Sequence, residues 1–112
     1  MIKTTMQKGL ILLLTLFISL VSLAQDISTD AGVITQGQGL FSDNCTQCHM
    51  IGTKLVGPDL KNVLTRVKPD WIKAFITNST VVINGGDKYA IKLFKEYNKT
   101  EMPAHSFSDE EL

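Results

Sequence analysis

The sequence predicts an all-α domain, and three observations lead to that class. Apolar residues recur at helical spacing in several segments of the chain. No stretch alternates convincingly between apolar and polar residues with the period of two that strands show. Residues that favour helix starts, namely Pro69, Asp87 and Ser108, stand at the beginning of three segments. We therefore expect several short helices and no sheet.

The N-terminal half of the domain is expected to hold a long helix, a loop and a short helix. The long helix covers residues 33–44 and the short one residues 60–66. Residues 50–60 contain two glycines and a proline, which predict an ordered loop between the two helices. Four residues at helical spacing form the apolar face of the long helix: Val33, Gly37, Leu40 and Phe41.

Two further helices are expected in the C-terminal half. Pro69 begins the first of them, since proline is tolerated at the first helical position, and residues 78–86 break its pattern. Asp87 can cap the next helix, which Asn98 ends. A loop over residues 99–107 follows.

The end of the chain carries the signature of a helix start. Ser108, with Glu111 three residues later, forms a capping box. The sequence stops at Leu112, inside the first turn of that helix. We expect this last helix to be incomplete, and the chain to be a fragment or to be completed by a partner.

The first 24 residues are typical of a secretory signal peptide. Lys3 and Lys8 carry positive charges, residues 10–23 are an apolar run, and Ala24 ends a small-residue cleavage site. The run is shorter than the roughly 20 apolar residues that a spanning helix needs. We therefore expect residues 1–24 to be removed on export, and contact with a membrane through this segment only if it is retained.

Cleavage of the signal peptide would leave a mature chain of residues 25–112. Residues 25–34 are expected to be a flexible leader, and residues 35–112 the folded domain. Because Lys3 and Lys8 leave with the signal, nine Lys and Arg residues face eleven Asp and Glu residues, a formal charge of −2. This balance excludes the basic face that nucleic-acid binding needs. A domain of this size buries little surface and often needs a staple.

One motif carries recognisable chemistry, the run Cys45-Thr46-Gln47-Cys48-His49. Cys-x-x-Cys-His is the attachment signature of c-type haem. Two thiols about one helical turn apart can reach the two vinyl groups of a porphyrin. The next side chain, His49, then lies under the iron, so the motif predicts one haem held covalently through Cys45 and Cys48.

Two other readings of the cysteine pair find less support. A thioredoxin-like redox centre usually lies in a βαβ unit, and the sequence shows none. A zinc site needs a second pair of ligands, and beyond His49 only His105 remains.

Residues 35–112 resemble class I cytochromes c. Besides the haem motif, the likeness rests on Gly37 and Phe41, on the Gly57-Pro58-Asp59-Leu60 loop, on a tryptophan-bearing helix and on Met102-Pro103. Residues 54–112 also resemble the monohaem domains attached to bacterial quinol-oxidising respiratory complexes. The resemblance implies a cytochrome c-like fold of several short helices around one haem.

The axial ligands follow from this resemblance. It makes His49 the proximal ligand and gives the Pro58 carbonyl the role of accepting the other ring N–H, a bond that fixes the tautomer. Met102 is the implied sixth ligand, since Met50 follows His49 directly and cannot easily reach the opposite face. His105 remains the alternative sixth ligand.

The periphery of the haem involves two further residues. The resemblance implies that Trp71 and Arg66 donate to the haem propionates, as an indole N–H and a guanidinium can. Trp71 as a plain core residue and Arg66 as a solvated surface charge stay open as alternatives. Apolar residues expected to wall the pocket are Leu60, Phe75, Ile76 and Phe94.

The expected function is single-electron transfer between redox proteins of an exported respiratory chain, in the periplasm or an equivalent compartment. A membrane respiratory complex is among the expected partners. No nucleophile–base pair presents itself, so the sequence gives no support for a hydrolase. A small protein with both axial sites of its haem filled has nowhere to bind a substrate, so we expect an electron-transfer protein rather than an enzyme. The alternative is a haem peroxidase or gas-binding haem protein with a displaceable sixth ligand, which carbon monoxide or cyanide would reveal.

Overall fold

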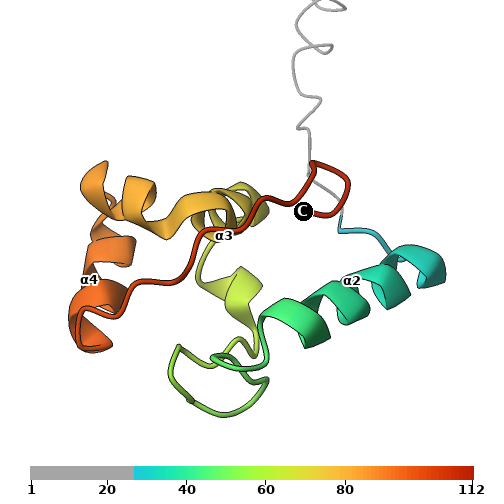
Figure 1. Cartoon of the computed structure of the whole chain (residues 1–112), viewed down its shortest axis with the longest axis horizontal. Helices are drawn as coiled ribbons and strands as arrows, with labels where there is room; N and C mark the ends of the chain where they lie inside the picture. The colour runs from blue at the N-terminus through green and yellow to red at the C-terminus, as the bar shows by residue number, and fades with distance from the viewer. Residues whose placement is uncertain (1–26) are drawn as a thin grey trace, which may run out of the picture.

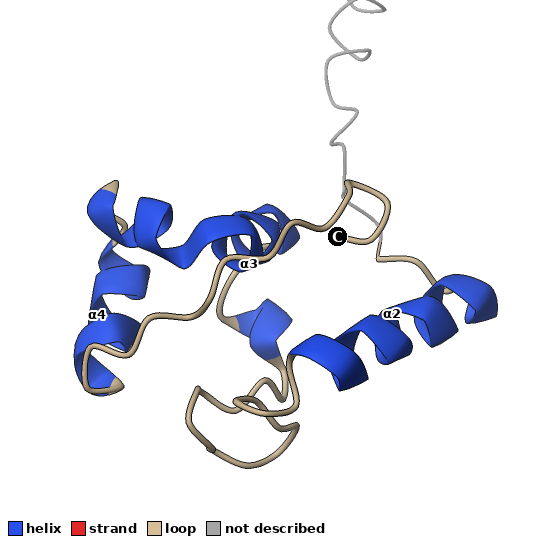
Figure 2. Cartoon of the chain, in the orientation of Figure 1, coloured by secondary structure: helices blue, strands red, loops and turns tan. Residues whose placement is uncertain are grey.

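The computed structural model describes residues 27–112, so the predicted signal peptide over residues 1–24 lies outside the described residues. This part of the chain contains helices and no strand, which confirms the all-α class (Figure 2). The elements in order are α2 (Ala31–Asn44), the 3-10 helix η2 (Val63–Thr65), α3 (Pro69–Asn84) and α4 (Lys88–Glu96). No helix within residues 27–112 has the length and apolar character to cross a bilayer.

The helices lie around a cavity lined by residues of α2, α3 and α4, rather than stacking into one bundle. Helices α3 and α4 pack against each other, while α2 lies apart from them (Figure 1). The loop after α2 closes this cavity on one side. The segment after α4 runs back past α3, and its end lies in a groove with the first turns of α2.

Helix α2 begins earlier than predicted. The Asp30 carboxylate accepts hydrogen bonds from the N–H groups of Gly32 (2.8 Å) and Val33 (3.1 Å), and the helix starts at Ala31. Asp30 is therefore the N-cap. Residues 31 and 32, which were predicted to precede the helix, are helical because this cap satisfies two of the first free N–H groups.

Helix α3 is interrupted where the sequence predicted a break, but it resumes. Asn78 is extended (φ −163°, ψ 96°), and its side-chain oxygen accepts a hydrogen bond from the N–H of Val81 at 3.1 Å. Asn78 thus caps a second helical segment that runs to Asn84. The prediction of an irregular stretch over residues 78–86 was wrong for residues 79–84, because this cap starts the helix again, whereas residues 85 and 86 do form a turn.

Helix α4 begins at its predicted cap, whereas the short helix before α3 is shorter than predicted. Asp87 accepts from the N–H of Ala90 at 2.7 Å and caps α4, as predicted. Asn98 is left-handed (φ 57°) and follows the helix end. The short helix predicted over residues 60–66 is only the three-residue η2, because Asn62 before it is also left-handed (φ 54°).

The end of the chain forms the predicted capping box. The N–H of Ser108 donates to the Glu111 carboxylate at 2.8 Å, and the N–H of Glu111 donates to the Ser108 hydroxyl at 3.3 Å. The described tail lies in a groove beside Val33 and Leu64, which are 49% and 50% exposed. Gly37, which also lines this groove, has nothing within 4 Å of where a Cβ would stand.

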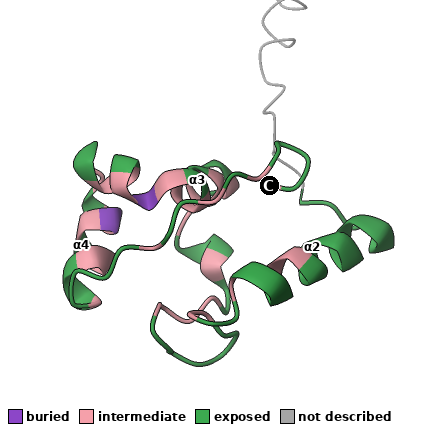
Figure 3. Ribbon diagram, in the orientation of Figure 1, coloured by how far each residue is buried: buried purple, intermediate pink, exposed green. Residues whose placement is uncertain are grey.

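Complete burial is rare in this fold. Among residues 27–112, only Ser79 on α3 and Ala90 on α4 are fully buried (Figure 3). Most of the aromatic and large aliphatic side chains of α3 and α4 are half-buried instead. The apolar surface that a small domain would bury in a core therefore faces a shared cavity.

Candidate haem site

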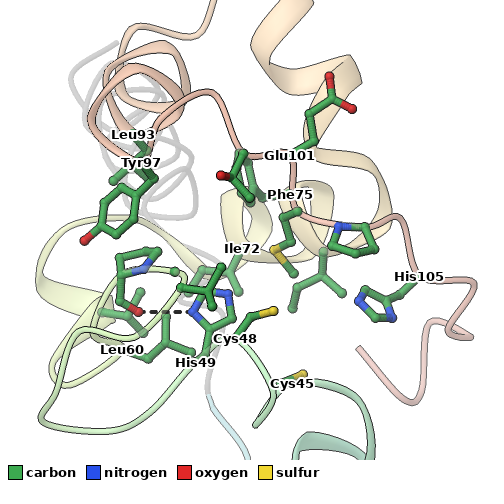
Figure 4. A pocket seen from close by; sticks show the side chains of 18 of the residues that line it. Cys45, Cys48, His49, Leu60, Ile72, Phe75, Leu93, Tyr97, Glu101 and His105 are labelled. Carbon is green, nitrogen blue, oxygen red and sulfur yellow. Dashed lines mark hydrogen bonds between the residues drawn. The ribbon is translucent and has the colours of Figure 1, made fainter.

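The two cysteines lie on one helical turn that extends α2. Cys45 is the C-cap residue, and its carbonyl accepts from the N–H groups of Cys48 (3.1 Å) and His49 (2.9 Å). This turn brings both thiols and the imidazole to the same side, facing the cavity (Figure 4). No disulfide joins Cys45 and Cys48. Because a helix has about 3.6 residues per turn, their three-residue spacing sets the two side chains side by side.

Burial raises the pKa of the Cys45 thiol above its ordinary value. Reactive disulfide-exchanging cysteines have a lowered pKa, because the thiolate is the nucleophile. The raised pKa of Cys45, together with the absence of strands in residues 27–112, therefore argues against a thioredoxin-like redox centre.

His49 is oriented by the loop that follows it. Its Nδ1 lies 3.1 Å from the carbonyl oxygen of Pro58, the pair of atoms that the family resemblance joins. When Nδ1–H donates to this carbonyl, Nε2 keeps its lone pair for a metal. The N–H of Gly57 donates to the Cys48 carbonyl at 2.8 Å, which fixes the loop against the motif.

Gly57 is a site residue that the sequence noted only as part of a loop. A Cβ on Gly57 would collide with Cε1 of His49 and would lie 2.8 Å from Nδ1 and 3.0 Å from Nε2. The imidazole therefore rests flat against the Gly57 backbone. Its place directly before Pro58 was the available signal.

Gly57→Ala is expected to displace the His49 ring and to break its bond to Pro58. Overpacking of this kind costs about 1–3 kcal/mol, and loss of an outer partner weakens metal ligation. Thermal unfolding and the ferric spectrum of the holoprotein report both effects. Gly39→Ala is the matched control, because a Cβ there meets nothing within 4 Å; equal behaviour of the two variants would contradict the close packing.

Asp59 and Arg66 hold the same loop from its outer side. One Asp59 carboxylate oxygen accepts from the N–H groups of Gly52 (2.6 Å) and Lys61 (2.7 Å). Arg66 donates to the carbonyls of Asp59 (2.6 Å) and Lys61 (3.2 Å). Two of the five N–H donors of the guanidinium therefore bond to the loop, and Arg66 also lines the cavity.

The stability of this loop is expected to depend on pH through Asp59. The N–H of Lys61 holds the pKa of the Asp59 carboxyl below its ordinary value, with Gly52 and Arg66 acting in the same direction. A carboxyl with a lowered folded-state pKa stabilises the protein above its unfolded-state pKa, and this contribution is lost as the pH falls through the folded-state pKa.

Asp59→Asn tests this dependence, since it removes the charge and keeps an acceptor oxygen. We expect the variant to unfold at a lower temperature than the wild type at neutral pH. The difference should vanish in acid, where Asp59 is protonated. A difference that does not change with pH would show that the charge is irrelevant.

All of the predicted site residues line one cavity. It has a volume of about 370 Å³ and is lined mainly by aromatic and aliphatic side chains, within the size range of cofactor sites. The predicted site residues all reach it: Cys45, Cys48, His49, Pro58, Arg66, Trp71 and Met102. His105, the alternative ligand, lines it too, with its ring stacked on Phe107 at 5.3 Å.

The indole nitrogen of Trp71 lacks a hydrogen-bond partner among the described residues. Its ring stacks on Phe75 (4.7 Å between centroids) and meets Tyr89 edge-on (5.4 Å). Its Nε1 is buried and has no hydrogen-bond partner among the described residues. A buried donor without a partner costs free energy, and a carboxylate of a group bound in this cavity would satisfy it. This observation fits a haem propionate.

Comparison with known proteins decides the family. A family model described as "Cytochrome c" matches residues 34–112. The chain belongs to the cytochrome c family. This cytochrome therefore binds one haem c covalently, through Cys45 and Cys48.

Solved structures agree with the family. Cytochrome c from Rhodothermus marinus shares 32% identity, with a TM-score of 0.67, and the match covers 81% of this chain and 75% of that one. An engineered form of that protein bound to a carbene intermediate has 33% identity, a TM-score of 0.65 and the same coverage. The comparison with curated proteins found no match.

Proposed function

We propose that this protein works as a haem c electron carrier, a function that its membership of the cytochrome c family supports. When bound, the haem supplies an iron that takes up and releases one electron at a time. The chain itself attaches the group through two thiols, orients His49 through Pro58 and Gly57, and excludes water with an apolar wall.

We propose that Met102 is the sixth ligand, and that the protein carries electrons between redox proteins of an exported respiratory chain. The observation that carries this proposal is that His49 and Met102 line one apolar cavity. A thioether fills the last coordination position and favours ferrous iron. With His49 and Met102 both holding the iron, the site would have no place for a substrate.

Partner docking is supported by the loop that follows His49. Its apolar side chains Met50, Ile51, Leu55 and Val56 are exposed. Between them, Lys54 places its ammonium 4.3 Å from the ring centroid of Tyr97, which lines the cavity. An exposed apolar patch with a positive charge beside it suits brief contacts with other redox proteins, which use small interfaces.

Export is supported by the charged, apolar and small-residue order of residues 1–24. The mass of the mature holoprotein tests it directly. A chain that begins at Gln25 is expected, and a chain that retains Met1 would contradict cleavage.

Carbon monoxide and cyanide test the closed sixth position. Neither ligand is expected to shift the Soret band of the reduced or oxidised holoprotein within the mixing time, because Met102 must first dissociate. An immediate shift with both ligands would instead indicate the peroxidase or gas-binding function.

A further inference from the structure

Ser79 is a polar side chain in a place where none was predicted. It is fully buried on α3, directly after the interruption at Asn78. Packing of α3 against α4 alone would need no hydroxyl there, and α4 presents Ala90 at its own fully buried position. Burying a hydroxyl is unfavourable unless it is hydrogen-bonded.

The Ser79 hydroxyl is bonded to the segment that carries the proposed ligand. Its Oγ donates to the main-chain carbonyl of Met102 at 2.7 Å, across 23 residues of sequence. A second bond joins the same two segments, since the N–H of His105 donates to the carbonyl of Ile76 at 3.2 Å. The two bonds bracket Met102 to His105 and tie this stretch to α3.

The interruption of α3 makes both bonds available. Carbonyl groups in the last turn before a helix break lack their regular partners, and Ile76 lies in that turn. Its carbonyl accepts from His105 instead. Asn78 caps the next segment, and Ser79 is the first residue of that segment.

We propose that Ser79 is a positioning residue for the sixth ligand, holding the Met102 main chain so that its thioether stays on the iron. The inference rests on the proposed role of Met102. Without the hydroxyl, the Met102 carbonyl loses this hydrogen bond, and the segment is held by the His105 bond to α3 and by the thioether on the iron. The thioether should then leave the iron more often, and small ligands should enter faster.

The test uses the full-chain holoprotein and the rate at which cyanide binds to ferric iron. Ser79→Ala is expected to raise this rate roughly tenfold, the effect of one lost buried hydrogen bond. It should also weaken the far-red absorption band of the ferric protein, which arises from the bond between the methionine sulfur and the iron. Thr77→Ala is the matched control. The Thr77 hydroxyl donates to the main-chain carbonyl of Lys73 within the same helix (2.9 Å) and not to the Met102 segment, so its loss should leave the rate unchanged.

A second background separates positioning from general loosening. In Met102→Ala, where no thioether remains to be displaced, adding Ser79→Ala should leave the cyanide rate unchanged. An equal acceleration in both backgrounds would overturn the proposal, because Ser79 would then act on the fold alone. So would a wild-type rate and an unaltered band in Ser79→Ala.

Failure of the underlying assignment looks different. If the wild type lacks the far-red band and binds cyanide as fast as Met102→Ala, Met102 is not the ligand and both proposals fall. If the wild type shows the band and Ser79→Ala retains it with an unchanged rate, only the proposal for Ser79 falls.

Discussion

Replacing both Cys45 and Cys48 with alanine is expected to give a protein without covalent haem that is largely unfolded. Only two residues of the described chain are fully buried, and the large side chains of α3 and α4 face the haem cavity. A chain of this size gains much of its core from the cofactor. Loss of the attachment therefore removes most of the free energy of folding, which circular dichroism and thermal unfolding measure.

Thr46→Ala is the control for the cysteine variant. Thr46 lies between the two cysteines and is exposed, and its hydroxyl donates to the Ser42 carbonyl at 2.8 Å. It should keep its haem through acid-acetone extraction. Haem that survives the same extraction in the double variant would contradict thioether attachment.

Met102→Ala is expected to open the iron and to lower the reduction potential. The thioether stabilises ferrous iron, and axial ligands set potentials over a range of about 0.8 V. We expect a decrease on the order of 0.2 V, loss of the far-red band, and fast cyanide binding. Redox titration and the ferric spectrum measure these changes.

His105→Ala is the control for the sixth ligand, since His105 lines the same cavity. It should leave the band and the potential near their wild-type values. The opposite pattern, with His105→Ala altering the spectrum and Met102→Ala leaving it unchanged, would assign the sixth position to His105.

What the sequence could predict was local. The all-α class follows from the helical spacing of apolar residues. The haem motif consists of five consecutive residues, and a single helical turn sets their geometry. Asp87 was predicted as a cap because its signal lies within three residues of its partner.

The contacts that the sequence did not reveal join distant segments or depend on unusual backbone. No spacing rule relates Ser79 to Met102, and the flat contact of Gly57 with His49 appears only once the loop has folded. The early start of α2 was missed because Asp30 stands in a polar stretch that resembles a leader. The carbonyl contacts of Arg66 required the left-handed turn at Asn62 to be known.

The most direct test of the central claim is a redox titration of the purified holoprotein followed by its visible spectrum. We predict one reversible one-electron transition, with both axial positions filled in the oxidised and the reduced state. A spectrum that shows an open sixth position in either state, or a site that does not cycle reversibly, would contradict a role in electron transfer.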